Sequence, residues 1–83
     1  MKEIEWTKRA LRQLRKIKHR DDQRSIYTAV GTLVDFPDCD NVKKIKTTDM
    51  YRLRVGRWRV LFTESLEIIT IQEVKKRNER TYR

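Results

Sequence analysis

The 83-residue sequence contains a single cysteine, Cys39, so no disulfide bond can form within the chain. One isolated thiol is typical of proteins that remain in the reducing cytosol. The chain has one histidine, His19, and no second cysteine, so it lacks the spaced ligands of a zinc site. We therefore expect no metal and no cofactor, and we interpret Cys39 as an inert thiol.

Long apolar runs are also missing from the sequence. No segment approaches the roughly 18 apolar residues of a membrane-spanning helix, and no signal peptide is recognised. No basic amphipathic helix carries the apolar face with which a membrane surface is bound. We expect a cytoplasmic protein of one domain, residues 1–83, with no membrane contact and no linker, repeat or low-complexity segment.

Acidic residues are few compared with basic ones, 12 against 21, which leaves a net charge of +9. The excess is uneven along the chain, because residues 1–42 carry a net charge of +2 and residues 43–83 carry +7. A surface of this kind favours nucleic acid or an acidic protein as the partner. The apolar residues, 37% of the chain, are periodic and predict a folded domain rather than a disordered one.

Residues 51–62 are the most informative stretch, and they predict two strands joined by a Gly-Arg turn at positions 56–57. Glycine supplies the positive φ that the first central residue of a type II′ turn requires. This turn sets Arg54 opposite Arg59, and side chains alternate between the two faces of each strand. The apolar face of the predicted hairpin carries Tyr51, Leu53, Val55, Trp58, Val60 and Phe62.

The other face of this hairpin carries Arg52, Arg54 and Arg59. Like charges set directly across a strand pair destabilise it, so a face selected for stability alone would mix signs. Guanidinium groups bind phosphate oxygens with two parallel hydrogen bonds. The pattern favours a site for a phosphate-bearing polyanion, and the alternative is a solvated basic face without a ligand.

Apolar spacing predicts two helices before the hairpin, the first over about residues 8–18 with Thr7 as its N-cap. The second begins at a cap formed by Asp21 or Asp22 and continues to about Asp35. Its inward residues are expected to be Ile26, Tyr27, Val30, Leu33 and Val34. The exposed face of the first helix carries Arg9, Arg12, Arg15 and Lys16. It is either a solvated surface or a secondary contact with nucleic acid.

Three further strands are predicted at Lys2–Trp6, Val42–Lys46 and Leu66–Val74. The last has a near-continuous apolar centre, which is typical of a strand covered on both faces. The lysines of the Val42–Lys46 strand are expected beside the basic face. The predicted fold is α+β, a small mostly antiparallel sheet in the order β-α-α-β-β-β-β, with an N-terminal helical hairpin packed on one face.

Four segments resemble the RelE/ParE superfamily of toxins from bacterial toxin–antitoxin modules. They are VKKIK at residues 42–46, YRLRVGRWRVLF at residues 51–62, VKKR at residues 74–77 and the Tyr82-Arg83 end. The resemblance covers most of the chain and implies a small sheet with a helical hairpin, in agreement with the pattern above. It also implies a cognate acidic antitoxin as a partner.

The RelE branch of this superfamily cleaves messenger RNA in the ribosomal A site without a metal, by attack of a 2′-hydroxyl on the adjacent phosphate. By resemblance, the catalytic residues are Arg52, Arg54, Arg59, Arg77 and Tyr82. Arg59 corresponds to the arginine that stabilises the transition state, Arg77 to a proposed general acid, and Tyr82 to a tyrosine that contacts the substrate. Contacts with messenger and ribosomal RNA are expected from Lys44, Lys46, Arg57, Lys75 and Lys76.

Arg54 stands where the best-known pattern of the branch has a lysine that is a candidate general base. Arginine keeps its proton in proteins, so we expect catalysis by electrostatic stabilisation and placement, with the ribosome supplying the substrate geometry. Glu79 is either a base or a surface partner of Arg77 or Arg83. Two other functions stay open, a ParE-like inhibitor of DNA gyrase and a nucleic-acid-binding module without chemistry.

Overall fold

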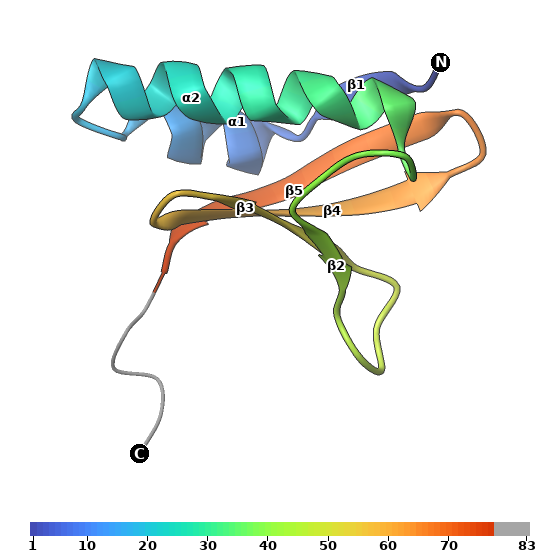
Figure 1. Cartoon of the computed structure of the whole chain (residues 1–83). Coiled ribbons are helices and arrows are strands. Elements are labelled where there is room, and N and C mark those ends of the chain that lie inside the picture. Colours follow the sequence, from blue (N-terminus) through green and yellow to red (C-terminus); the bar gives the residue numbers. More distant parts are fainter. Residues whose placement is uncertain (78–83) are drawn as a thin grey trace.

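The computed structural model describes residues 1–77, in which two α-helices and a short 3₁₀ helix cover one face of a five-stranded sheet (Figure 1). The bounds are β1 Glu3–Trp6, α1 Lys8–Arg15, α2 Arg20–Gly31, η1 Thr32–Asp35, β2 Val42–Lys44, β3 Tyr51–Val55, β4 Trp58–Ser65 and β5 Ile68–Lys76. Apart from the 3₁₀ helix η1, this is the order of elements that the sequence predicts. No helix within these residues is both long and apolar enough to cross a membrane.

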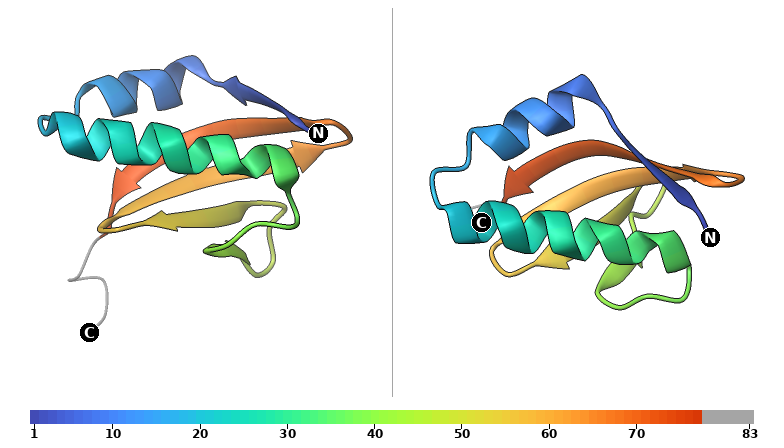
Figure 2. Two further views of the ribbon diagram at one scale, coloured as in Figure 1. Left: turned by 45° about the horizontal axis from the view of Figure 1, so that its top comes forward. Right: turned by 90° about the horizontal axis from the view of Figure 1, so that it is seen from above.

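The strands lie side by side in the order β1-β5-β4-β3-β2. β1 is parallel to β5, and the other neighbouring strands are antiparallel, which confirms the predicted α+β class and mostly antiparallel sheet. α1 packs on β5, and α2 packs on β3 and β4, as the view from above in Figure 2 shows. No element among the described residues covers the opposite side of the sheet, which we call the open face.

The β3–β4 hairpin has the predicted register, with Arg54 opposite Arg59. Gly56 has a φ of 56°, the positive value that the turn requires. The apolar side of the hairpin faces the helices, where Phe62 is fully buried. The ring centroid of Phe62 lies 5.6 Å from that of Phe36 in an edge-to-face contact and 5.4 Å from that of Tyr51 in a stacked one. The core therefore lies between the helical layer and one face of the sheet.

Helix α1 is shorter than predicted, because the chain leaves the helix after Arg15 rather than near residue 18. Thr7 is the predicted N-cap, and its side-chain oxygen accepts a hydrogen bond from the Ala10 N–H at 3.1 Å. Ile17 lies beyond the helix but is still buried in the core. The Gln23 side chain donates to the Ile17 carbonyl at 2.7 Å, so this carbonyl is satisfied without a further helical turn.

Helix α2 departs from the prediction at its start and on its exposed side. Its N-cap is His19, which makes no capping hydrogen bond through its side chain, rather than Asp21 or Asp22. Asp22 instead accepts a hydrogen bond from the Trp58 indole N–H at 3.1 Å. Tyr27, predicted to face inward, is 63% exposed, and its ring stacks on Trp6 with 6.1 Å between centroids.

The strand bounds also need two corrections. β2 ends at Lys44, two residues earlier than predicted, and β5 covers Ile68–Lys76 instead of residues 66–74. The expectation that β5 is covered on both faces is wrong. Ile69 and Ile71 are buried against the helices, whereas Thr70 is only partly buried on the open face.

The turn between β4 and β5 contains Leu66, which has a φ of 56° and is 86% exposed. A non-glycine residue in this conformation is strained by about 1–2 kcal/mol, and glycine removes this strain. Glycine also loses more conformational entropy on folding, which costs about 0.5–1 kcal/mol. We expect Leu66→Gly to raise the free energy of unfolding by about 0.5–1 kcal/mol, measured by urea denaturation. Leu66→Ala is the control, because it removes the apolar side chain and keeps the strain. An equal gain in both variants would exclude strain as the cause.

Candidate functional site

The open face of the sheet gathers basic side chains from four neighbouring strands. In the register of the sheet, Lys43 lies opposite Arg52, Arg54 lies opposite Arg59, and Arg59 lies opposite Lys75. We call these five residues the cationic face. Three like-charge pairs thus follow one another from β2 to β5, an arrangement that lowers the stability of the sheet.

Three members of the cationic face have no acidic partner among the described residues. Within residues 1–77, Lys43, Arg52 and Arg54 take part in no ion pair. Lys75 approaches Glu73 at 4.0 Å, the limit of an ion pair, and both side chains are solvent-accessible. The guanidinium groups of Arg52 and Arg54 are therefore suited to an anionic ligand with several oxygens, such as a phosphate.

Arg77 follows β5 directly, and its backbone places it at the end of the cationic face. Its N–H donates to the carbonyl of Arg57, in the hairpin turn, at 2.6 Å. Arg57, which is predicted to contact RNA, lines a separate pocket of about 430 Å³ where α2 begins. Of these two predicted residues, the structure therefore brings only Arg77 beside the cationic face.

A β-bulge in β5 sets which side chains of that strand reach the cationic face. Phe62 pairs with Ile71, but the preceding Leu61 pairs with Glu73, so the strand contains an extra residue. Ile71 and Val74 would face opposite sides of a regular strand, yet both are buried in the core. The bulge therefore directs Lys75 to the open face. The apolar spacing of two and then three residues in Ile69, Ile71 and Val74 was a signal for it that the prediction missed.

Gln13 of α1 holds this bulge in place. Its side-chain oxygen accepts a hydrogen bond from the Val74 N–H at 2.7 Å, across 61 residues of sequence. We expect Gln13→Met to lower the free energy of unfolding by about 1–3 kcal/mol, because a partly buried N–H loses its acceptor. Gln13→Glu keeps an acceptor and should stay closer to the wild type in urea denaturation. Equal losses in both variants, or unchanged hydrogen exchange of the Val74 and Arg77 amides in Gln13→Met, would contradict this role.

Two lysines predicted to bind RNA lie on the other side of the sheet. Lys44 is opposite Tyr51, and its Nζ lies 5.8 Å from the centre of the Tyr51 ring. Lys76 is opposite Trp58, which packs against the core. Both side chains therefore face the helical side, because alternate residues of a strand point to opposite faces. Lys46 lies beyond β2, exposed in the turn that leads to β3.

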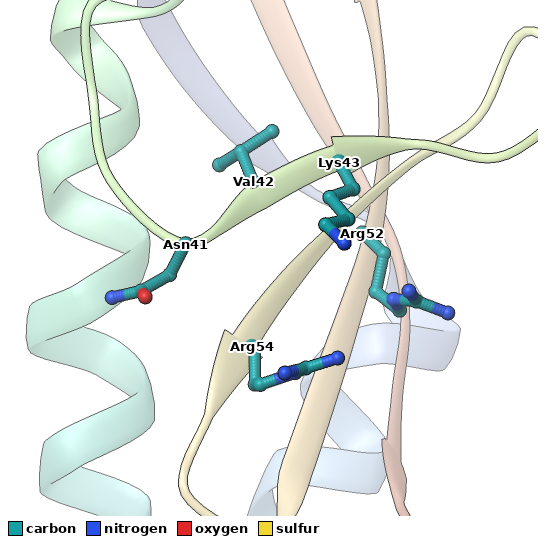
Figure 3. A pocket seen from close by; sticks show the side chains of 5 residues that line it. All are labelled: Asn41, Val42, Lys43, Arg52 and Arg54. Carbon is teal, nitrogen blue, oxygen red and sulfur yellow. The ribbon is translucent and has the colours of Figure 1, made fainter.

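Asn41 was not predicted as a site residue, and Lys43 was expected beside the basic face but not among the residues that contact RNA. Together with Val42, Arg52 and Arg54 they line a pocket of about 210 Å³ at the β2 edge of the sheet (Figure 3). Identifying Lys43 in advance would have required the β2–β3 register. A longer loop joins these strands, so no tight turn reveals that register in the sequence.

The remaining candidate residues lie in the C-terminal segment or at Cys39. Tyr82, Glu79 and Arg83 lie outside the described residues. Burial, with the nearby carboxylates of Asp40, Asp35 and Asp38, raises the pKa of the Cys39 thiol, which disfavours the reactive thiolate. No group of three or more His, Cys, Asp or Glu side chains within residues 1–77 is arranged to hold a metal ion.

Comparison with known proteins shows which protein family this chain matches. Residues 4–81 match the sequence profile described as the ParE toxin of the type II toxin–antitoxin system parDE. The chain belongs to this family of type II toxins. The resemblance to the RelE/ParE superfamily that the sequence predicts is thereby confirmed. A search of curated protein sequences finds no significant match to this toxin.

Solved structures of RelE proteins share the fold of this toxin. The archaeal RelE–RelB complex of Pyrococcus horikoshii matches with a TM-score of 0.79 and 22% identity, over 94% of this chain and 97% of that one. The isolated RelE toxin of E. coli matches with a TM-score of 0.79 and 15% identity, over 98% of this chain and 89% of that one. The YoeB dimer of Staphylococcus aureus matches with a TM-score of 0.71 and 16% identity, over 93% and 98%.

Proposed function

We propose that this toxin is a ribosome-dependent endoribonuclease that cleaves messenger RNA in the A site. The single observation that carries this proposal is the like-charge pair Arg54 and Arg59 on the open face. Arg52 lies on the same face, and neither it nor Arg54 is in an ion pair within residues 1–77. Such a cluster does not stabilise the sheet, but it does stabilise a phosphodiester on which negative charge develops during cleavage.

The proposed reaction is attack of the 2′-hydroxyl oxygen of a ribose on the adjacent phosphorus, without a metal. The proton of the 2′-hydroxyl is lost to water, the bond from phosphorus to the 5′-oxygen breaks, and the 5′-oxygen takes up a proton from water. The products are a 2′,3′-cyclic phosphate and a 5′-hydroxyl. Arg52, Arg54 and Arg59 stabilise the negative charge on the phosphorane oxygens. Arg77 lies near the leaving oxygen and offsets its charge. Tyr82 is proposed to contact the nucleotide by stacking or hydrogen bonding.

Placement supplies the rest of the proposed rate acceleration. Arg54 keeps its proton at neutral pH, so it acts through its charge and not as a base. Holding the 2′-hydroxyl in line with the phosphate lowers the barrier further, and the ribosomal A site imposes that geometry on the messenger. Cleavage of naked RNA is accordingly expected to be weak. The toxin acts in the cytoplasm in this proposal, where ribosomes are found.

An acidic antitoxin is the proposed physiological partner. Solved structures with this fold include toxin–antitoxin complexes of RelE with RelB. An acidic segment laid over the cationic face would neutralise it and block access of RNA at the same time. The charge distribution supports this, because residues 43–83 hold a net charge of +7.

The function is tested by inducing the toxin and mapping the 5′ ends of ribosome-bound messengers. We expect new ends that carry a 5′-hydroxyl and fall at a fixed position within A-site codons. A toxin with both Arg54 and Arg59 replaced by alanine should produce none of them. Intact transcripts with normal translation after induction would refute the proposal.

Inhibition of DNA gyrase is the second candidate function, favoured by the ParE description of the matching family. A supercoiling assay with purified gyrase separates the two, because an endoribonuclease leaves supercoiling unaffected. A third possibility, binding without chemistry, is separated by Arg59→Ala and Arg77→Ala. In a nuclease, these variants lose far more activity than affinity for RNA, whereas in a simple binder the loss of toxicity is no greater than the loss of affinity.

A further inference from the structure

A pocket of about 210 Å³ lies at the β2 edge of the sheet, and Arg54 of the Arg54–Arg59 pair is one of the residues that line it (Figure 3). Its lining includes three cations and no acidic residue. In Figure 3, the side chains of Lys43 and Arg52 lie side by side although they come from neighbouring strands, and Arg54 follows further along β3. β2 and the loop after it bend away from the helical layer, so the β2 edge of the sheet projects on the side of the open face (Figure 1).

The register gives the pocket a simple relation to the proposed cleavage site. Lys43 lies opposite Arg52, and Arg54 lies opposite Arg59. Arg52 and Arg54 are two residues apart on β3, which corresponds to about 7 Å along the strand. Two like-charge pairs therefore lie next to each other on the open face, at a spacing comparable to that of consecutive phosphates in an extended single strand.

The backbone immediately before β2 keeps the two pairs in this relation. Asn41 has a φ of 66°, a conformation that asparagine adopts more readily than most residues. Its carbonyl accepts a hydrogen bond from the Arg54 N–H at 2.9 Å and extends the β2–β3 ladder by one step. Lys43 is thus fixed relative to Arg54 by strand pairing rather than by a flexible loop.

We propose that Lys43 binds a second phosphate, the one next to the scissile phosphate on the same RNA strand. Arg52 lies between the two phosphates, and Arg54 and Arg59 hold the scissile phosphate together with it. This inference rests on the proposed function for the identity of the ligand. The spacing of these cations thus matches two consecutive phosphates of an extended single strand. A folded or duplex RNA could not present its phosphates in the same way.

The test compares two substitutions that each remove one positive charge. Lys43→Gln removes a cation from the pocket, whereas Arg24→Gln removes one from an exposed position of α2, in the helical layer. The probe is a short single-stranded RNA with 2′-O-methyl riboses, which cannot undergo attack by a 2′-hydroxyl. Its dissociation constant is measured by fluorescence anisotropy over a series of salt concentrations, after thermal unfolding has shown both variants to be folded.

For Lys43→Gln we expect about a 3–10-fold weaker affinity at low salt. The slope of the logarithm of the binding constant against the logarithm of the salt concentration should become shallower by about 0.7, the value for one phosphate of a single strand. Arg24→Gln should keep the wild-type values within about twofold, because no phosphate contact is removed. Equal effects of the two substitutions would overturn the proposal, and so would a wild-type toxin without measurable affinity for the probe. If Lys43→Gln alone weakens binding but induction produces no cleaved messenger, the second phosphate position stands and the endoribonuclease function fails.

Discussion

Arg54→Ala is expected to lower cleavage of ribosome-bound messenger RNA by about 10²–10³-fold, the usual effect of removing one preorganised donor from a developing oxyanion. The same substitution should leave the free energy of unfolding unchanged or raise it by a few tenths of a kcal/mol. Arg54 is exposed, lies opposite Arg59 and has no ion pair within residues 1–77, so its removal relieves repulsion and creates no cavity. A substitution that lowers activity but does not lower stability indicates a residue that serves ligand binding rather than the fold.

Two variants make this measurement specific. Arg24→Ala removes the same charge from an exposed position of α2, in the other layer of the fold, and should keep cleavage within about twofold. Arg54→Lys keeps the charge but loses the two parallel hydrogen bonds, so an intermediate rate is expected. Cleavage is measured as 5′-hydroxyl ends on purified ribosomes, and stability by urea denaturation. A loss of activity in Arg54→Ala that is matched by a loss of stability, or by Arg24→Ala, would contradict a role in the site.

The part of the site that could be predicted from sequence is the part fixed by a short turn. Gly56 and its neighbour leave one register for the β3–β4 hairpin, so the opposition of Arg54 and Arg59 followed from alternation alone. Lys43 and Lys44 show the limit of the same reasoning. The loop before β3 does not set a register, and a shift of one residue exchanges which of the two lysines faces the arginines.

Tertiary contacts explain the other differences between prediction and structure. Asp22 looked like a helix cap, but its carboxylate accepts the Trp58 N–H from β4, a partner that no local pattern reveals. The bulge in β5 depends on Gln13, which lies 61 residues away from Val74. In both cases a polar side chain of a helix satisfies a group of the sheet, and the identity of that group is known only once the layers are packed.

The cationic face lowers the stability of β3, β4 and β5, so the opposite face of the same strands must compensate for it. Three aromatic rings do so at the centre of the core. Phe62 is fully buried, and its ring contacts Phe36 and Tyr51 with centroids 5.6 and 5.4 Å away. Aromatic pairs of this kind add about 0.5–1.5 kcal/mol to the effect of burial alone. Phe62 is therefore the side chain whose loss is expected to affect the fold most.

Phe62→Ala is expected to lower the free energy of unfolding by about 3–5 kcal/mol, a large fraction of the roughly 4–12 kcal/mol of a domain this size. Urea denaturation should show a much lower midpoint or no native baseline, whereas Phe62→Leu should lose less because most of the volume is kept. A midpoint close to the wild type in Phe62→Ala would show that the core lies elsewhere. Phe62→Ala and Arg54→Ala should both strongly lower cleavage, but only the first should do so by unfolding the strand on which Arg59 lies. This contrast separates the face of the sheet that holds the toxin together from the face that we propose acts on RNA.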